Sequence, residues 1–129
     1  MRRMAHYEFR VEVSPEYLPD QSAPQDDVFS FAYTITISNT GQVPAQLISR
    51  HWVITDAAGQ IEEVKGLGVV GHQPLLKPGE SFRYTSGCRL RTSSGTMEGR
   101  YFCVAEDGER FEAPIPVFVL DSGTRRVLH

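Results

Sequence analysis

The sequence predicts an all-β protein that folds as an antiparallel β-sandwich of about seven strands. Three observations support this prediction. Apolar and polar residues alternate with a period of two in several segments, turn residues separate these segments, and no stretch of ten residues shows helical periodicity. Because no helices are expected to cover parallel strands, the sheets are expected to be antiparallel.

The first half of the chain is expected to contribute four strands. In the third of these, Ile48, Trp52 and Ile54 fall on one face. The segment Ser14–Asp27 contains three prolines and scattered acids, so we expect a loop there. The expected strands cover about 7–13, Phe29–Ile37, Ala45–Thr55 and Gln60–Val64.

The second half is expected to contribute three more strands, at about 82–88, 101–105 and 111–119. A glycine-rich loop is expected over Lys65–Pro78, and Ser93–Gly95 is expected to break the chain. Asp107-Gly108 is typical of a hairpin turn. Pro114 and Pro116 cannot donate ladder hydrogen bonds, so they predict that the last strand lies at a sheet edge or is irregular.

Length and charge set the broad class. The 129 residues and net charge of -3 are typical of one domain, for which we expect a core over about 6–120 and a polar tail over 121–129. We expect no nucleic-acid partner, because there is no basic stripe. No apolar stretch follows the arginines near the N-terminus, so neither export nor membrane association is expected. In the cytoplasm Cys88 and Cys103 are then free thiols.

Two aromatic residues narrow the type of sandwich. Trp52 lies on the third strand, where immunoglobulin-like folds bury a tryptophan, and Tyr101 precedes Cys103 by two residues, as in the tyrosine corner of such folds. The second strand offers no cysteine for an inter-sheet disulfide. The chain is therefore expected to be nearer the fibronectin type III variant.

Several segments resemble the ApaG family. They span most of the chain and are 49–52 (SRHW), 68–74 (GVVGHQP), 76–82 (LKPGESF), 84–87 (YTSG), 95–99 (GTMEG) and 111–118. The resemblance implies a fibronectin type III-like β-sandwich in a bacterial cytoplasmic protein. It also implies an association with cobalt and magnesium handling and, in some genomes, a neighbouring dinucleoside-polyphosphate hydrolase. Related domains in eukaryotic F-box proteins and in a DNA-polymerase-interacting protein imply protein binding, and the family has no established catalytic residues.

Residues 66–71 have the spacing G-x-G-x-x-G, which in dinucleotide-binding folds brings a pyrophosphate to a glycine-rich backbone and a helix N-terminus. Pro74 and Pro78 leave little room for a helix, so two interpretations remain open. Backbone amides of the loop form an anion nest, or the glycines only permit positive φ in a connection between sheets. The resemblance also implies pyrophosphate binding at this motif. Residues that would bind a pyrophosphate are Lys65, Gly66, Gly68, Gly71 and His72.

Other polar residues do not form a catalytic or metal-binding pattern. Arg50 shares a face with Trp52 and either needs a carboxylate or carbonyl partner or extends its head into water at a sheet margin. His51 is expected on the opposite face, at the surface. The histidines show no ligand spacing, so no metal and no cofactor are expected. Glu62-Glu63 and Glu106-Asp107 are expected to be solvated turn charges.

These observations predict a non-enzymatic binding module whose partner is an unidentified protein. Because loops on a rigid scaffold commonly carry function, Ser14–Asp27 and Lys65–Pro78 are the expected contact surfaces. The alternative function is binding of pyrophosphate or a nucleotide polyphosphate through the Gly66–Gly71 loop.

Overall fold

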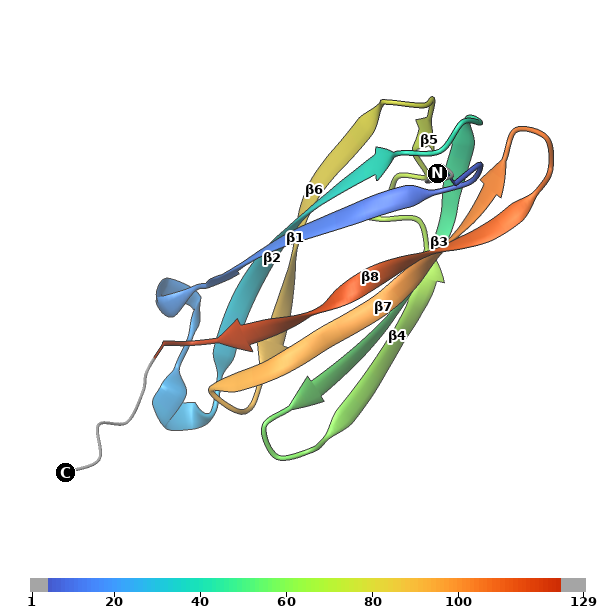
Figure 1. Cartoon of the computed structure of the whole chain (residues 1–129). Coiled ribbons are helices and arrows are strands. Elements are labelled where there is room, and N and C mark those ends of the chain that lie inside the picture. Colours follow the sequence, from blue (N-terminus) through green and yellow to red (C-terminus); the bar gives the residue numbers. More distant parts are fainter. Residues whose placement is uncertain (1–4, 124–129) are drawn as a thin grey trace, which may run out of the picture.

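The computed structural model describes residues 5–123 (Figure 1). Eight strands and two short 3-10 turns make up this part of the chain. The strands are β1 (Phe9–Tyr17), β2 (Phe29–Asn39), β3 (Ala45–Asp56), β4 (Ile61–Leu67), β5 (Leu75–Leu76), β6 (Ser81–Leu90), β7 (Ser94–Ala105) and β8 (Arg110–Asp121). The 3-10 turns, η1 (Pro19–Gln21) and η2 (Pro24–Asp26), follow β1.

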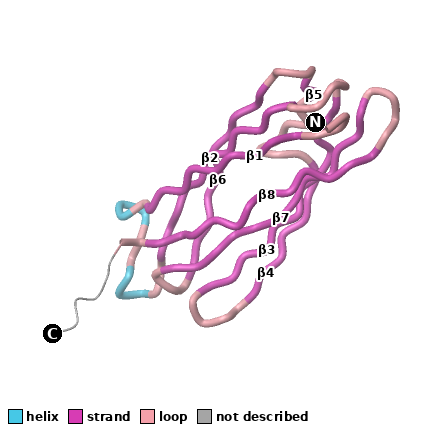
Figure 2. Tube along the Cα trace, in the orientation of Figure 1, coloured by secondary structure: helices cyan, strands magenta, loops and turns pink. Residues whose placement is uncertain are grey.

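The strands form two facing antiparallel sheets (Figures 1 and 2). One has the order β1-β2-β6, and the other has the order β4-β3-β7-β8. The short β5 pairs with the first two residues of β3. No α-helix occurs within residues 5–123, and no helix there is long and apolar enough to cross a membrane. The predicted antiparallel sandwich of the fibronectin type III-like class is confirmed.

Alternation along β2 explains how the core forms. Its odd-numbered residues from Phe29 to Ile37 are buried, because they face the second sheet, whereas Thr34 and Thr36 point outward and are only partly buried. Trp52 on β3 is 3% exposed and packs edge-on against Tyr33, as the sequence predicted for a core tryptophan. Cys103 is fully buried and Cys88 is partly buried, and both are free.

Several predicted boundaries are wrong. Ser14–Tyr17 continue β1 because they pair with β2, so the predicted loop over Ser14–Asp27 is shorter. Lys65–Leu67 belong to β4, because they pair with β3, and Leu75–Leu76 form β5, so the predicted loop over Lys65–Pro78 contains strand at both ends. Ser94 and Gly95 begin β7 and do not break the chain there. The predicted tail starts inside β8, and its residues 124–129 lie outside the described part.

Two β-bulges change which side chains face inward. The register of β3 against β7 shifts between Leu47 and Ser49, so Leu47 is fully buried and Ile48, predicted to face inward, is only partly buried. The register of β7 against β8 shifts between Met97 and Gly99. Beyond that second bulge Phe118 packs against the core, whereas Val117 is 59% exposed.

The two long margins of the sandwich differ. On one margin β1 and β8 lie side by side, so the two sheets meet there (Figure 1). β8 is an edge strand, as its prolines predicted. On the other margin β4 and β6 are the edge strands of their sheets, and a cleft separates them. The sandwich is therefore closed on one side and open on the other.

Candidate functional site: a hollow on the five-stranded sheet

A hollow of about 420 Å³ lies on the outer face of the five-stranded sheet. Four strands contribute to it, and most of its lining side chains are polar. It is lined by Ser49, Arg50, His51, Lys65, Gly66, Leu67, Arg100, Phe102 and Glu112. Because every lining residue belongs to a strand, the sheet itself sets the shape of the hollow.

Cross-strand register brings three basic side chains into one row. His51 on β3 pairs with Lys65 on β4 and with Arg100 on β7. Directly opposed residues on neighbouring strands place their side chains on the same face of the sheet, close enough to act together. The row Lys65–His51–Arg100 therefore crosses three strands, and we call it the basic row.

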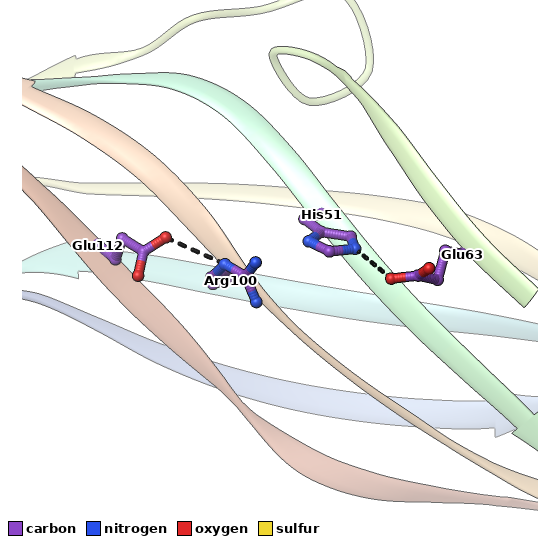
Figure 3. Close-up of polar contacts among 4 residues, drawn as sticks. All are labelled: His51, Glu63, Arg100 and Glu112. Carbon is purple, nitrogen blue, oxygen red and sulfur yellow. Dashed lines mark hydrogen bonds and ion pairs between the residues drawn. The ribbon is translucent and has the colours of Figure 1, made fainter.

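Two acidic side chains pair with the basic row (Figure 3). His51 Nε2 lies 2.8 Å from Glu63 Oε1, and Arg100 Nε lies 3.0 Å from Glu112 Oε2. The His51 side chain is 16% exposed, whereas the other three side chains are about half exposed or more. Exposed ion pairs of this kind contribute only about 0–1 kcal/mol, so Glu112 can leave Arg100 at little cost.

Lys65 completes the row without an ion-pair partner among residues 5–123. Beside it, Leu67 is 75% exposed, and Phe102 on β7 is half-buried. The hollow thus combines cationic groups with an apolar rim, a composition that suits a binding surface.

Arg50 faces the inner side of the same sheet. Its Nη1 donates to the carbonyl oxygens of Leu67 and Gly68, each at 2.9 Å. Within residues 5–123 it has no carboxylate at ion-pair distance. Of the partners left open from the sequence, Arg50 therefore uses carbonyls, and it ties the end of β4 to β3.

The G-x-G-x-x-G segment forms a tight turn after β4. Val69 and His72 exchange backbone hydrogen bonds of 2.8 and 2.9 Å, and the two residues between them, Val70 and Gly71, have positive φ values of 43° and 83°. This is the backbone that two-residue hairpin turns require. The Gly68 amide donates to Ile48 O at 2.8 Å. The amides of Gly68 and Val69 in the segment, and that of His72 directly after it, are therefore used inside the protein.

The residues predicted to bind pyrophosphate have different surroundings. Gly66 lies within β4 beneath Arg50, and Lys65 belongs to the basic row on the opposite face. His72 packs against Phe82, with ring centroids 5.6 Å apart. The structure therefore does not gather Lys65, Gly66 and His72 around one point, and pyrophosphate binding stays a prediction.

The buried thiols and phenols are poor acids. Burial raises the pKa of the Cys88 thiol to about 11 and that of Cys103 to about 12. The hydroxyls of Tyr101 and Tyr84 share a hydrogen bond of 2.5 Å across the two sheets. The Tyr101 hydroxyl makes no bond to the backbone of residues 5–123, although the predicted tyrosine corner would require one. Because the thiolate is the nucleophile, neither thiol is activated. No group of three or more metal-ligating side chains gathers within residues 5–123.

His51 and Lys65 were singled out from the sequence, whereas Arg100, Phe102 and Glu112 were not. Glu63 was interpreted as a solvated turn charge, and the structure places it on β4, paired with His51. The signal available was alternation: His51, Lys65 and Arg100 each lie at an outward position of a strand. The register between strands, which joins them, is a long-range property.

Comparison with known proteins gives one consistent result. The sequence profile of the ApaG domain matches residues 19–105. The chain is 70% identical to the protein ApaG of Acidovorax sp. (strain JS42) over 121 residues, which cover 92% of this chain and 88% of the relative. It is 64% identical to the protein ApaG of Ralstonia nicotianae over 126 residues, covering 98% of this chain and all of the relative.

A solved structure agrees with the sequence comparison. A crystal structure of an ApaA protein from Bordetella pertussis superposes with a TM-score of 0.92 at 54% identity. The match covers 95% of this chain and all of the Bordetella chain. The same arrangement of strands is therefore present in a relative at high sequence identity.

Proposed function

Because the chain belongs to the ApaG family, we propose that it is a non-enzymatic module that binds another protein through the hollow on its five-stranded sheet. The resemblance implies a protein-binding role for related domains, and the hollow supplies a surface with the chemistry for it. The partner, in this proposal, presents acidic side chains beside an apolar group.

The basic row carries this proposal. Lys65, His51 and Arg100 lie side by side across three strands, and the exposed Leu67 and the half-buried Phe102 adjoin them. Aromatic residues and arginine are enriched at protein interfaces, where an apolar centre is surrounded by polar contacts. A rigid sheet holds these groups in place before binding, which lowers the entropy lost on association.

The charge pattern favours an acidic partner. Lys65 has no ion-pair partner among the described residues, and Arg100 is held by one exposed glutamate. If a carboxylate of the partner displaced Glu112 from Arg100, the new ion pair would be more shielded from solvent than the exposed pair that it replaces. Charges arranged in this way contribute mainly to association rate and specificity.

The remaining parts of the proposal follow from the resemblance. The module acts in the cytoplasm, and its association with cobalt and magnesium handling arises through the partner protein. The raised thiol pKa values support a non-enzymatic role, because neither cysteine is a ready nucleophile.

Photo-crosslinking in the cells that naturally make the protein tests the proposal. A photoreactive phenylalanine replaces Phe102 in the hollow or, as the control, Thr34 on the outer face of the other sheet. We expect discrete protein adducts from position 102 alone, with a several-fold lower yield when Arg100→Glu is added. No adduct from position 102, or equal adducts from both positions, would contradict the proposal.

A further inference from the structure

We infer that the partner binds as an extended segment that adds to the free edge of β4, as a further strand of the five-stranded sheet. This inference rests on the proposed function, because β4 carries Lys65 and Leu67 of the hollow. Strand addition gives affinity through backbone hydrogen bonds and specificity through alternate side chains.

The backbone of β4 has hydrogen-bonding groups that point toward the open margin. Gly68 donates to Ile48 O and Gln60 O accepts from Asp56 N, which shows that even-numbered residues bond to β3. In an antiparallel ladder the residues between them direct their amides and carbonyls away from the neighbouring strand. Ile61, Glu63 and Lys65 therefore present backbone groups to the open margin, where no described strand pairs with them.

The two margins of the sandwich are protected against strand addition to different degrees. β1 and β8 lie side by side and contain Pro15, Pro114 and Pro116 (Figure 1). Natural sheets protect their edges against pairing with another chain by prolines, by charges or by a segment that covers the edge. Neither β4 nor β6 contains a proline. The charges of Glu62, Glu63 and Lys65 on β4 limit indiscriminate pairing and select a partner by its charge.

A cleft between β4 and β6 receives the inward side chains of the added strand. It has a volume of about 380 Å³. Its walls combine the apolar Trp52 and Val64 with Tyr33, the partly buried Cys88 and the charged Arg50, Glu62 and Arg89. An added strand beside β4 alternates like β4 itself, so every second side chain points toward this cleft and the others lie on the outer face.

These two faces define the chemistry of the segment. One of its cleft-facing side chains is apolar, because it meets Val64 beside Trp52, whereas others meet the charged Glu62 and Arg89. Its outward side chains include a carboxylate opposite Lys65 and apolar groups near Ile61 and Leu67, which are 67% and 75% exposed. The partner is therefore a protein with an extended segment that places an apolar residue toward the cleft and an acid on the outer face.

The first test uses a phage-displayed library of random dodecapeptides as the probe. We expect enriched peptides to share an apolar residue and an acid that point to opposite faces of an extended strand. When such a peptide binds, the amide protons of Ile61, Glu63 and Lys65 should exchange at least about tenfold more slowly by NMR, because they enter hydrogen bonds. A library without enriched peptides, or unchanged exchange at these three amides, would overturn the inference.

Matched variants separate the backbone of β4 from its side chains. Glu63→Pro removes an outward amide and should weaken peptide binding at least about tenfold, whereas Glu63→Ala keeps the amide and should weaken it less. Thr85→Pro makes the same change at an outward position of the β6 edge and should leave binding unchanged. Thermal melts establish that each variant folds. Equal binding by wild type and Glu63→Pro, or loss of binding in Thr85→Pro alone, would contradict addition to β4.

The two proposals fail in different ways. Crosslinking from position 102 without protection of the β4 amides would support the binding module and contradict strand addition. The absence of crosslinking from position 102 would contradict the proposed function itself.

Discussion

The guanidinium of Arg50 occupies the space that a side chain on Gly66 would fill. A Cβ atom on Gly66 would lie 2.8 Å from Arg50 Nη1 and 2.9 Å from its Cζ. Because this position has no side chain, the guanidinium reaches across β4 to the carbonyls of Leu67 and Gly68. Gly66, the first glycine of the G-x-G-x-x-G segment, therefore leaves room for the guanidinium of Arg50.

Gly66→Ala should therefore displace the guanidinium and lower stability. The two hydrogen bonds from Arg50 would be lost or lengthened, which lowers the free energy of unfolding by about 1–3 kcal/mol. Urea denaturation followed by Trp52 fluorescence measures the change. In an Arg50→Ala background the same substitution should cost less than about 1 kcal/mol, because the obstructing group is gone. Additive losses in the double variant would show that the two residues are uncoupled.

Gly68 and Gly71 should differ in their tolerance of alanine, although both have positive φ, 65° and 83°. A Cβ on Gly68 would lie 2.5 Å from the backbone oxygen of His72, whereas a Cβ on Gly71 meets nothing within 4 Å. Gly71→Ala should lower the free energy of unfolding by about 1–2 kcal/mol, from the backbone conformation alone. Gly68→Ala should lower it by about 3 kcal/mol or more, because the turn must open. Equal losses in urea denaturation would contradict this account of the turn.

Tyr84 and Tyr101 join the two sheets through their hydroxyls, 2.5 Å apart in the core. Tyr84→Phe leaves the fully buried Tyr101 hydroxyl without its partner and should lower the free energy of unfolding by about 1–3 kcal/mol. The double variant, with phenylalanine at both positions, has no unpaired hydroxyl, so its loss should be smaller than the sum of the two single losses. A double-mutant cycle in urea measures the coupling, and a coupling of zero would exclude a stabilising bond.

Much of the fold was predictable because burial follows local alternation. The faces of β2, the burial of Trp52 and the edge position of β8 all follow from patterns within single strands. The bulge at Ile48 was not predictable, because an extra residue changes the inward set without altering the local composition. The boundary at Leu67 was also missed, because glycines at 66 and 68 are typical of a loop and only pairing with β3 makes the segment a strand.

The candidate site was less predictable than the fold. Arg100 lies far from His51 and Lys65 in the sequence, and only the registers of β3 with β4 and β7 bring these three side chains into a row. Glu112 then joins from β8. Each of these residues alone has the appearance of an ordinary solvated charge. Cross-strand neighbours depend on the whole sheet, which alternation within one strand does not determine.

Tyr7 and Asp107 link the start of the chain to the β7–β8 hairpin and should make stability depend on pH. The Tyr7 hydroxyl donates to Asp107 Oδ2 at 2.5 Å. This bond, with burial and nearby acids, raises the pKa of Tyr7 to about 12. The same bond, with that from the Glu109 amide, lowers the pKa of Asp107 below its usual 3.8.

The direction of the pH effect follows from these shifts. The contribution of Asp107 is present above the pKa of the unfolded chain and is lost as pH falls through the lowered folded value. The contribution of Tyr7 is complete below its unfolded pKa of 10.0 and is lost as pH rises toward about 12. The melting temperature of Tyr7→Phe should therefore fall below that of wild type at neutral pH and approach it in strong acid and strong alkali. A difference that does not vary with pH would exclude this pair as its source.

Calorimetry with phosphate ligands distinguishes protein binding from the alternative function. The amides of Gly68, Val69 and His72 already donate to carbonyls of the chain, so they are not available to cradle an anion. We therefore expect no saturable heat from pyrophosphate, ADP or diadenosine polyphosphates at millimolar concentration, with or without magnesium, and no rise in melting temperature. Lys65→Ala is the matched variant, because Lys65 is the cation of the basic row without an ion-pair partner among the described residues. Saturable heat in wild type that Lys65→Ala abolishes would instead establish a phosphate site on β4, and the protein-binding proposal would then lose the surface on which it depends.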